Sequence, residues 1–176
     1  MLSVIARNSL YLLTSSLGQK VLAFLYFAMI ARYLGVENTG SYFFALSFAA
    51  MFGILLDMGL SPALVREGAR DETNRQRQLI SILSVKFPLA VFVLLVIFAV
   101  VSLSGYETER RDLVMVAALV MIFDSFHLTL YAALRSMQKF QYEAGGVLLG
   151  QICTMIFGLT VLFFNQSFFW LIGALG

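Results

Sequence analysis

The stretch LISILSVKFPLAVFVLLVIFAVVSL, residues 79–103, decides the fold class of this chain. It is apolar almost throughout, and Lys86 is its one charged residue. A helix needs about 20 apolar residues to cross ~30 Å of hydrocarbon, and this run exceeds that length. The run therefore predicts a transmembrane helix, with a kink expected at Pro88.

Similar apolar runs lie on both sides of this stretch, at residues 9–33, 41–60, 113–134 and 144–164. A sixth, residues 168–176, would reach only ~13 Å at 1.5 Å per residue. We therefore expect one transmembrane domain over residues 1–176, an all-α polytopic membrane helical bundle with five complete spans and the start of a sixth. The chain is expected to be the N-terminal piece of a longer protein.

Composition supports a membrane protein. Sixty per cent of the residues are hydrophobic, 12% are charged, and the mean hydropathy is +0.88. Soluble domains are nearer half apolar and a quarter charged. The net charge of +2 is small and its basic residues are spread over loops, so nucleic acid is not an expected partner.

The basic residues of the short loops predict the orientation, because such residues are enriched on the cytoplasmic side. A cytoplasmic N-terminus places seven of them inside and three outside. The inner set is Arg7, Arg66, Arg70, Arg75, Arg77, Arg135 and Lys139, and the outer set is Arg32, Arg110 and Arg111.

Charged residues also occur inside the expected spans, where they are costly and usually mark a substrate or ion path. Gln19 and Tyr26 belong to a polar face of the first span, with Lys20 beside it. Lys20 and Asp124 each lie about eleven residues from a span end, or ~16 Å deep. We expect these two either to neutralise each other or to line one cavity, which points to transport.

The fourth span carries Asp124, His127, Tyr131 and Arg135 on one helix face. His127 is either a hydrogen-bonded interior residue or, beside Asp124, part of a proton-coupling site. The single histidine and the single cysteine supply no recognisable metal-ligand set.

Other charges lie nearer the expected span ends. Asp57 is within reach of Arg66, so it could form a positioning ion pair or take part in transport. Arg32 and Lys86 are expected to extend their charged groups to the membrane interface.

Small residues recur every four positions in two spans, which lets helix backbones approach closely in lipid. The second-span ridge consists of Ala45, Ala49, Gly53, Asp57 and Ser61, and the fifth-span ridge consists of Gly146, Gly150, Thr154 and Gly158.

Two segments, Ala31–Phe48 (ARYLGVENTGSYFFALSF) and Leu55–Arg70 (LLDMGLSPALVREGAR), carry a family resemblance. They resemble the N-terminal signature of the polysaccharide flippases, in the superfamily that also holds the multidrug and toxin extrusion transporters and the lipid II flippases. The matching elements, in order, are Asn8, Ala31–Gly35, Gly40–Tyr42, Asp57–Gly59 and Arg66–Glu67.

The resemblance implies two six-helix lobes around a central cavity, with this chain forming most of the N-terminal lobe and a C-terminal lobe as its partner. It implies a non-enzymatic transporter in the cytoplasmic (inner) membrane of a prokaryote, working by alternating access. The implied substrate is a polyprenyl-diphosphate glycan, held among membrane lipids. No cofactor is implied, and a proton or sodium gradient is a candidate driving force.

Lys20 matches a basic position of the lipid II flippases, whereas Tyr26 stands where those relatives have a second basic residue. The expected substrate-binding set is Lys20, Gln19, Tyr26, Asp57, Arg66, Asp124, His127 and Arg135. The alternatives are a multidrug or cation antiporter, which would favour acidic cavity residues, and a membrane enzyme or scaffold of polyprenyl-lipid metabolism.

Overall fold

The computed structural model describes residues 2–163, and its secondary structure there is entirely helical. The helices are α1 (Leu2–Asp57), α2 (Leu60–Arg70), α3 (Arg75–Leu103), α4 (Thr108–Ser136) and α5 (Phe140–Phe163). This confirms the all-α class. The expected start of a further span at 168–176 lies outside the described residues.

The span count differs from the prediction. Four helical stretches are long and apolar enough to cross a membrane, namely Ser9–Arg70, Arg75–Leu103, Arg110–Ser136 and Phe140–Thr160. The prediction of five complete spans is wrong in this respect, because the expected spans 9–33 and 41–60 both fall within the single stretch Ser9–Arg70, most of which is α1.

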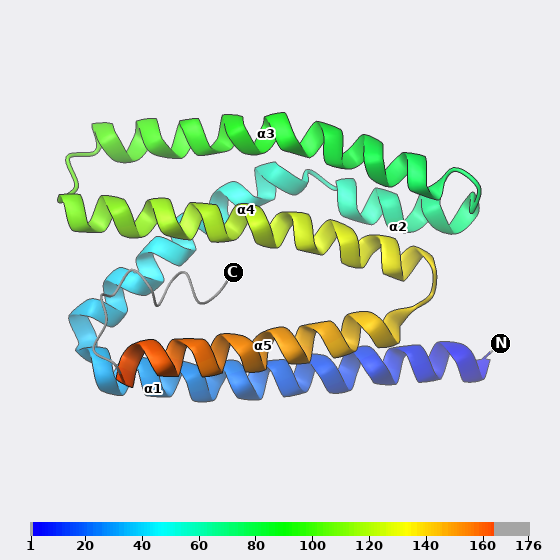
Figure 1. The fold of residues 1–176 in the computed structure, drawn as a ribbon, viewed down its shortest axis with the longest axis horizontal. Coiled ribbons are helices and arrows are strands. Elements are labelled where there is room, and N and C mark those ends of the chain that lie inside the picture. Colours follow the sequence, from blue (N-terminus) through cyan, green and yellow to red (C-terminus); the bar gives the residue numbers. More distant parts are fainter. Residues whose placement is uncertain (1, 164–176) are drawn as a thin grey trace.

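Gly35 explains how two expected spans become one element. Its backbone takes φ 73° and ψ 176°, a non-helical conformation that glycine adopts without the penalty of a Cβ atom. Beyond this kink the helix resumes at once. The side chains of Asn38 and Thr39 donate to the carbonyl groups of Leu34 and Gly35, at 3.2 Å and 2.6 Å. The chain therefore bends sharply without an intervening loop (Figure 1).

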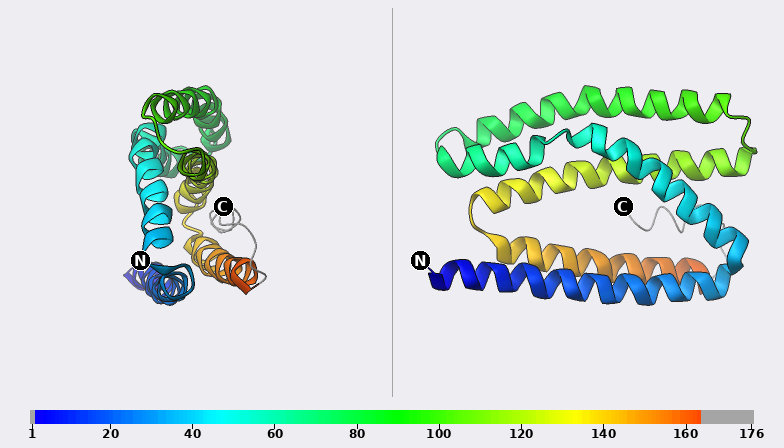
Figure 2. Two further views of the ribbon diagram at one scale, coloured as in Figure 1. Left: turned by 90° about the vertical axis from the view of Figure 1, so that its left-hand side faces the viewer. Right: turned by 180° about the vertical axis from the view of Figure 1, so that it is seen from behind.

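The kink separates two groups of helices. The first half of α1 (residues 2–34) lies alongside α5, and the second half (residues 36–57) runs obliquely to the group formed by α2, α3 and α4 (Figures 1 and 2). Buried residues of the second half pack with buried residues of α3 and α4 in the main hydrophobic core. They include Tyr42, Ala45, Ala49, Leu56, Val93, Ile97, Val101, Leu113, Val114, Ala117 and Ala118.

Close packing of the ridge in the second half of α1 is confirmed. Ala45 and Ala49 are each only 1% exposed, and Gly53 is buried. A Cβ atom added at Gly53 would lie 1.7 Å from the Met121 side chain of α4. The ridge therefore brings the α1 backbone against α4.

On α5 only part of the ridge of small residues packs closely against a neighbouring helix. Gly146 and Gly158 face the rings of Tyr131 and Tyr26, whereas a Cβ atom at Gly150 would meet nothing within 4 Å. Tyr26 was expected on a polar, substrate-binding face of the first span. In the structure its side chain is 4% exposed and packs against Gly158 instead.

These glycines provide a matched test of the α1–α5 contact. Gly158→Ala places its Cβ 2.0 Å from the Tyr26 hydroxyl oxygen and 2.6 Å from two ring carbons. We expect it to lower the free energy of unfolding by about 1–3 kcal/mol, as overpacking does. Gly150→Ala should be neutral or stabilising by up to about 1 kcal/mol, because alanine favours the helix. Unfolding in detergent measures both, and equal stabilities would refute this packing.

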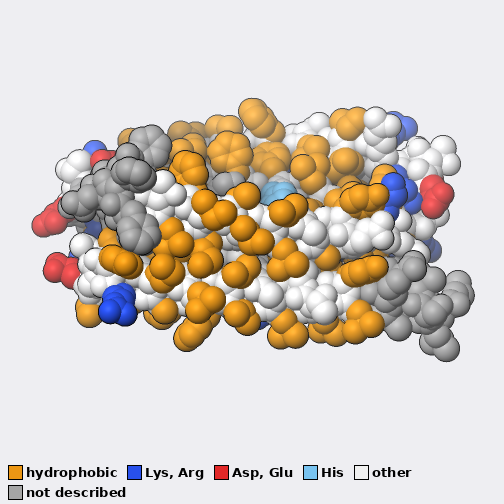
Figure 3. Space-filling model, turned by 60° about the horizontal axis from the view of Figure 1, so that its bottom comes forward, with side chains coloured by type: hydrophobic (Ala, Val, Ile, Leu, Met, Phe, Trp, Pro, Cys, Tyr) orange, Lys and Arg blue, Asp and Glu red, His pale blue; other side chains and the backbone are white. Residues whose placement is uncertain are grey.

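Hydrophobic side chains cover the middle of the face in Figure 3, while charged side chains gather toward its two ends. This distribution suits a bundle that crosses a membrane, and with the four apolar helical stretches it identifies a multi-pass membrane protein. One end holds the turn between α2 and α3, and the other holds the turn between α3 and α4 (Figure 1).

The turn between α2 and α3 is a polar, solvent-facing segment. Asp71 accepts hydrogen bonds from the backbone N–H groups of Thr73 and Asn74, both at 3.1 Å, and from the Asn74 side chain at 2.7 Å. These hydrogen bonds hold the pKa of the Asp71 carboxyl below its ordinary value, and the bond from the Asn74 side chain has the largest effect.

The orientation can be tested at these turns. With the native Cys153 replaced by serine, a cysteine at Asn74 should react with a membrane-impermeant thiol reagent only from the cytoplasmic side. A cysteine at Thr108 should react only from outside. The basic residues near the α2–α3 turn predict that this end of the bundle is cytoplasmic, and Thr108 lies at the opposite end. Labelling of position 74 from outside would reverse the assignment.

Candidate functional site

A fully buried lysine in the middle of α3 is the centre of the site. The Lys86 side chain is 0% exposed. The expectation that it reaches the membrane interface is therefore wrong. The physical reason is that neighbouring helices supply enough oxygen atoms to replace water around the ammonium group.

Four oxygen atoms surround the Lys86 ammonium nitrogen. It donates to Asp57 Oδ1 at 2.8 Å and to Thr129 Oγ1 at 2.7 Å. It also contacts both the carbonyl oxygen and the hydroxyl oxygen of Ser125, each at 3.0 Å. The Thr129 hydroxyl donates in turn to the Ser125 carbonyl at 3.0 Å. The positive charge is thus both paired and hydrogen-bonded, as burial requires.

Asp57 holds this site at a break in the chain. It is the last residue of α1, and Met58 and Gly59 follow with positive φ values of 42° and 82° before α2 begins. Ser61, one turn on, donates to Asp57 Oδ1 at 2.5 Å. We call Asp57, Ser61, Lys86, Ser125 and Thr129 the Lys86 network, and it joins α1, α2, α3 and α4.

Arg66 does not take the role that was expected beside Asp57. Its guanidinium group is exposed and pairs with Glu67 at 3.2 Å, while Asp57 pairs with Lys86. An exposed pair of this kind contributes little to stability. Arg66 therefore belongs to the surface of α2.

A second ion pair closes the turn between α4 and α5. Arg135 Nε donates to both carboxylate oxygens of Glu143, at 2.9 Å and 2.8 Å, and a second guanidinium nitrogen also contacts this carboxylate. Glu143 is only 3% exposed. The two-oxygen geometry fixes the start of α5 against the end of α4.

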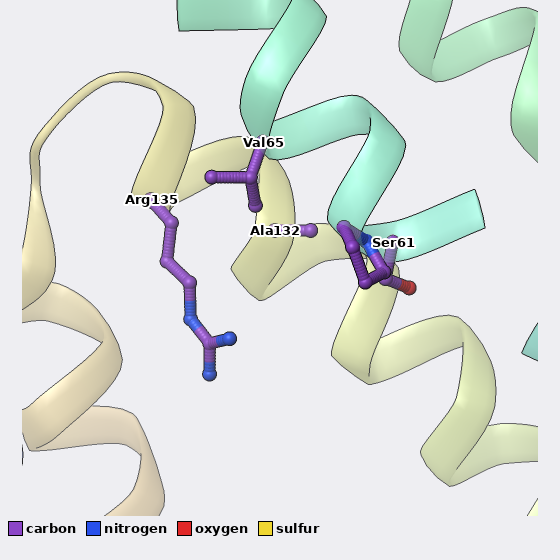
Figure 4. Close-up of a pocket in the computed structure, with 5 residues that line it drawn as sticks. Ser61, Val65, Ala132 and Arg135 are labelled. Atoms are coloured by element: carbon purple, nitrogen blue, oxygen red, sulfur yellow. The ribbon is translucent and has the colours of Figure 1, made fainter. Parts of the chain in front are cut away.

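Arg135 also lines a pocket of about 280 Å³ between α2 and α4. The other lining residues are Ser61, Pro62, Val65 and Ala132. Figure 4 shows the Arg135 side chain extending away from the labelled Val65 and Ala132. The pocket is therefore mainly apolar, with a cation at its edge and with Ser61 linking it to the Lys86 network.

The remaining predicted residues lie on exposed helix faces. Lys20, Gln19, Asp124 and His127 are all exposed, and the His127 ring lies 4.1 Å from the Tyr131 ring, centroid to centroid. Among the ion pairs of the described residues, none joins Lys20 to Asp124. The expected direct neutralisation of these two charges is therefore not seen, and the alternative that they line one cavity stays a prediction.

Metal ligands do not gather in this part of the chain. Within residues 2–163, no three His, Cys, Asp or Glu side chains lie close enough together to hold a metal ion. The polar groups that meet in the Lys86 network and in the Arg135–Glu143 pair are ammonium, guanidinium, carboxylate, hydroxyl and backbone carbonyl groups.

Comparison with curated proteins and with solved structures gives no match for this chain. A family model does match it, over residues 5–175, and the description of that family is "Polysaccharide biosynthesis protein". The match covers nearly the whole sequence and includes the helices that build the Lys86 network. The chain therefore belongs to the polysaccharide biosynthesis protein family.

Proposed function

We propose that this protein moves lipid-linked oligosaccharide, a polyprenyl-diphosphate glycan, across the cytoplasmic membrane for cell-surface polysaccharide biosynthesis. The observation that carries the proposal is the family match over residues 5–175 of a chain built from apolar, membrane-length helices. A glycan made inside the cell on a lipid carrier must cross the membrane, and that step requires a polar path through the bilayer.

Lys20 is the proposed ligand of the diphosphate group. Its side chain is exposed near the middle of the first half of α1. A cation held at that depth needs an anionic partner, and among the described residues no ion pair supplies one. The diphosphate of the lipid carrier provides that partner during transport.

Other exposed polar residues complete the proposed path. Gln19 follows the same part of α1, while Asp124 and His127 are exposed on α4. Amide, carboxylate and imidazole groups can hydrogen-bond sugar hydroxyls as the glycan passes. Arg135 lies at the same end of the bundle as the α2–α3 turn, the end expected to be cytoplasmic. There it would be among the first residues to meet the diphosphate.

The Lys86 network has a different role in this proposal. All the donors of its lysine point at protein oxygens, so it is already satisfied without a substrate. It fixes α1, α3 and α4 together, so that these helices can move as one body during alternating access. A proton or sodium gradient remains the proposed driving force.

A cation antiporter is the second candidate, favoured by the exposed carboxylate of Asp124 beside His127. The two functions differ in what accumulates when the gene is deleted. We expect lipid-linked glycan to build up on the cytoplasmic face and surface polysaccharide to disappear, with both restored by the intact gene. Normal surface polysaccharide combined with sensitivity to toxic cations would instead support the antiporter.

A further inference from the structure

The oxygen atoms around Lys86 have the composition of a monovalent-cation site. They comprise one carboxylate oxygen from Asp57, one backbone carbonyl oxygen from Ser125, and the hydroxyl oxygens of Ser125 and Thr129. Transporters and channels use carbonyl and carboxylate oxygens to replace the water around sodium or potassium. Here Asp57 stands at a helix break, while Ser125 and Thr129 lie inside α4.

The number and spacing of these oxygens fit a spherical cation as well as an ammonium group. An ammonium group has three hydrogens, yet four oxygens lie within 3.0 Å of the Lys86 nitrogen. Two of them must share one hydrogen, whereas a metal ion has no such limit. Potassium is close in size to ammonium, so a site with these distances favours potassium over the smaller sodium.

The site is also reachable. Lys86 is fully buried, but Asp57 keeps 30% of its side chain exposed and lies at the break between α1 and α2. Shortening the lysine would leave the oxygens in place and empty the space that its alkyl chain now fills. A free cation could then enter beside Asp57.

We propose that the Lys86 network is a monovalent-cation site whose occupant is the protein's own tethered ammonium group. The intact protein therefore needs no free sodium or potassium here, and a coupling ion for transport must bind elsewhere. Removing the ammonium converts the site into one for free ammonium or potassium.

The test is thermal unfolding of the purified chain in detergent, in choline, sodium, potassium or ammonium chloride at equal ionic strength. Lys86→Ala should unfold at a midpoint roughly 5–10 °C higher at an ammonium concentration a hundred times its dissociation constant than in choline, with potassium next and sodium weakest. The unchanged protein and the exposed-lysine control Lys139→Ala should show no such ranking.

The double variant Lys86→Ala/Asp57→Asn lacks the carboxylate and should show no cation response. A response that survives in this variant would place the cation elsewhere and overturn the assignment. Equal midpoints of Lys86→Ala in all four salts would overturn it too. So would a Lys86→Ala protein that folds in none of the salts while the double variant folds, because the oxygens would then be unable to hold a free cation.

Discussion

Asp57→Ala is expected to lower the free energy of unfolding by about 3–5 kcal/mol, because it leaves the Lys86 ammonium buried without its counter-charge. The lysine is 0% exposed and its other partners are neutral oxygens of Ser125 and Thr129. These oxygens cannot offset a full charge in a low-dielectric interior. Denaturant unfolding in detergent, followed by the loss of helical signal, measures the change.

Two controls separate the loss of the charge pair from the loss of a side chain. The double variant Asp57→Ala/Lys86→Met removes both charges and should recover most of the stability, since an apolar replacement of a buried pair is often neutral or better. Glu72→Gln removes the charge of an exposed side chain that pairs with Arg75 at 3.4 Å, and it should cost no more than about 1 kcal/mol. If Asp57→Ala cost as little as Glu72→Gln, the pair would not be buried as described.

Lys20→Ala, in the complete gene product, is expected to reduce glycan export at least about tenfold. The reason is that the variant loses one charge-assisted hydrogen bond to the diphosphate. The protein should still insert and accumulate normally, because the Lys20 side chain is exposed and belongs to no ion pair among the described residues. Lys20→Arg keeps the charge and should retain part of the export. Surface polysaccharide per cell, normalised to protein level, measures both.

The matched control for Lys20 is Lys139→Ala, which removes an exposed lysine from the turn between α4 and α5 and should leave export unchanged. Lys20→Ala/Asp124→Ala should not restore export, because these two charges form no pair. Full export by Lys20→Ala at a normal protein level would remove Lys20 from the substrate path. Restored export in the double variant would show that the two side chains neutralise each other.

The helical elements after the kink could be predicted from the sequence because apolar length is a local property. The expected spans 79–103, 113–134 and 144–164 correspond to α3, α4 and α5 (Arg75–Leu103, Thr108–Ser136 and Phe140–Phe163). The merger of the first two spans could not be predicted in this way. Gly35 and the polar residues after it are typical of a loop, and only the backbone shows that the helix resumes directly.

The candidate site was harder to predict, because burial depends on partners distant in sequence. Lys86 meets Asp57 across 29 residues and Thr129 across 43. One signal was available: Asp57 and Ser61, and likewise Ser125 and Thr129, are polar pairs four residues apart in the sequence. Ser125 and Thr129 share a face of α4, whereas Asp57 and Ser61 lie on the two sides of the break between α1 and α2. The depth of a residue in the membrane can be counted from a span end, as for Lys20 and Asp124. The sequence alone does not show whether that face of the helix points to another helix, to lipid or to a cavity.

The most direct test of the proposed function is translocation by the complete gene product reconstituted in lipid vesicles. A polyprenyl-diphosphate oligosaccharide is placed in the outer leaflet, and an impermeant glycosidase reports how much remains accessible. The proposed function predicts that glycan becomes protected faster than in protein-free vesicles, and more slowly with the Lys20→Ala variant. Protection at the protein-free rate, with efflux of an organic cation from the same vesicles, would contradict it.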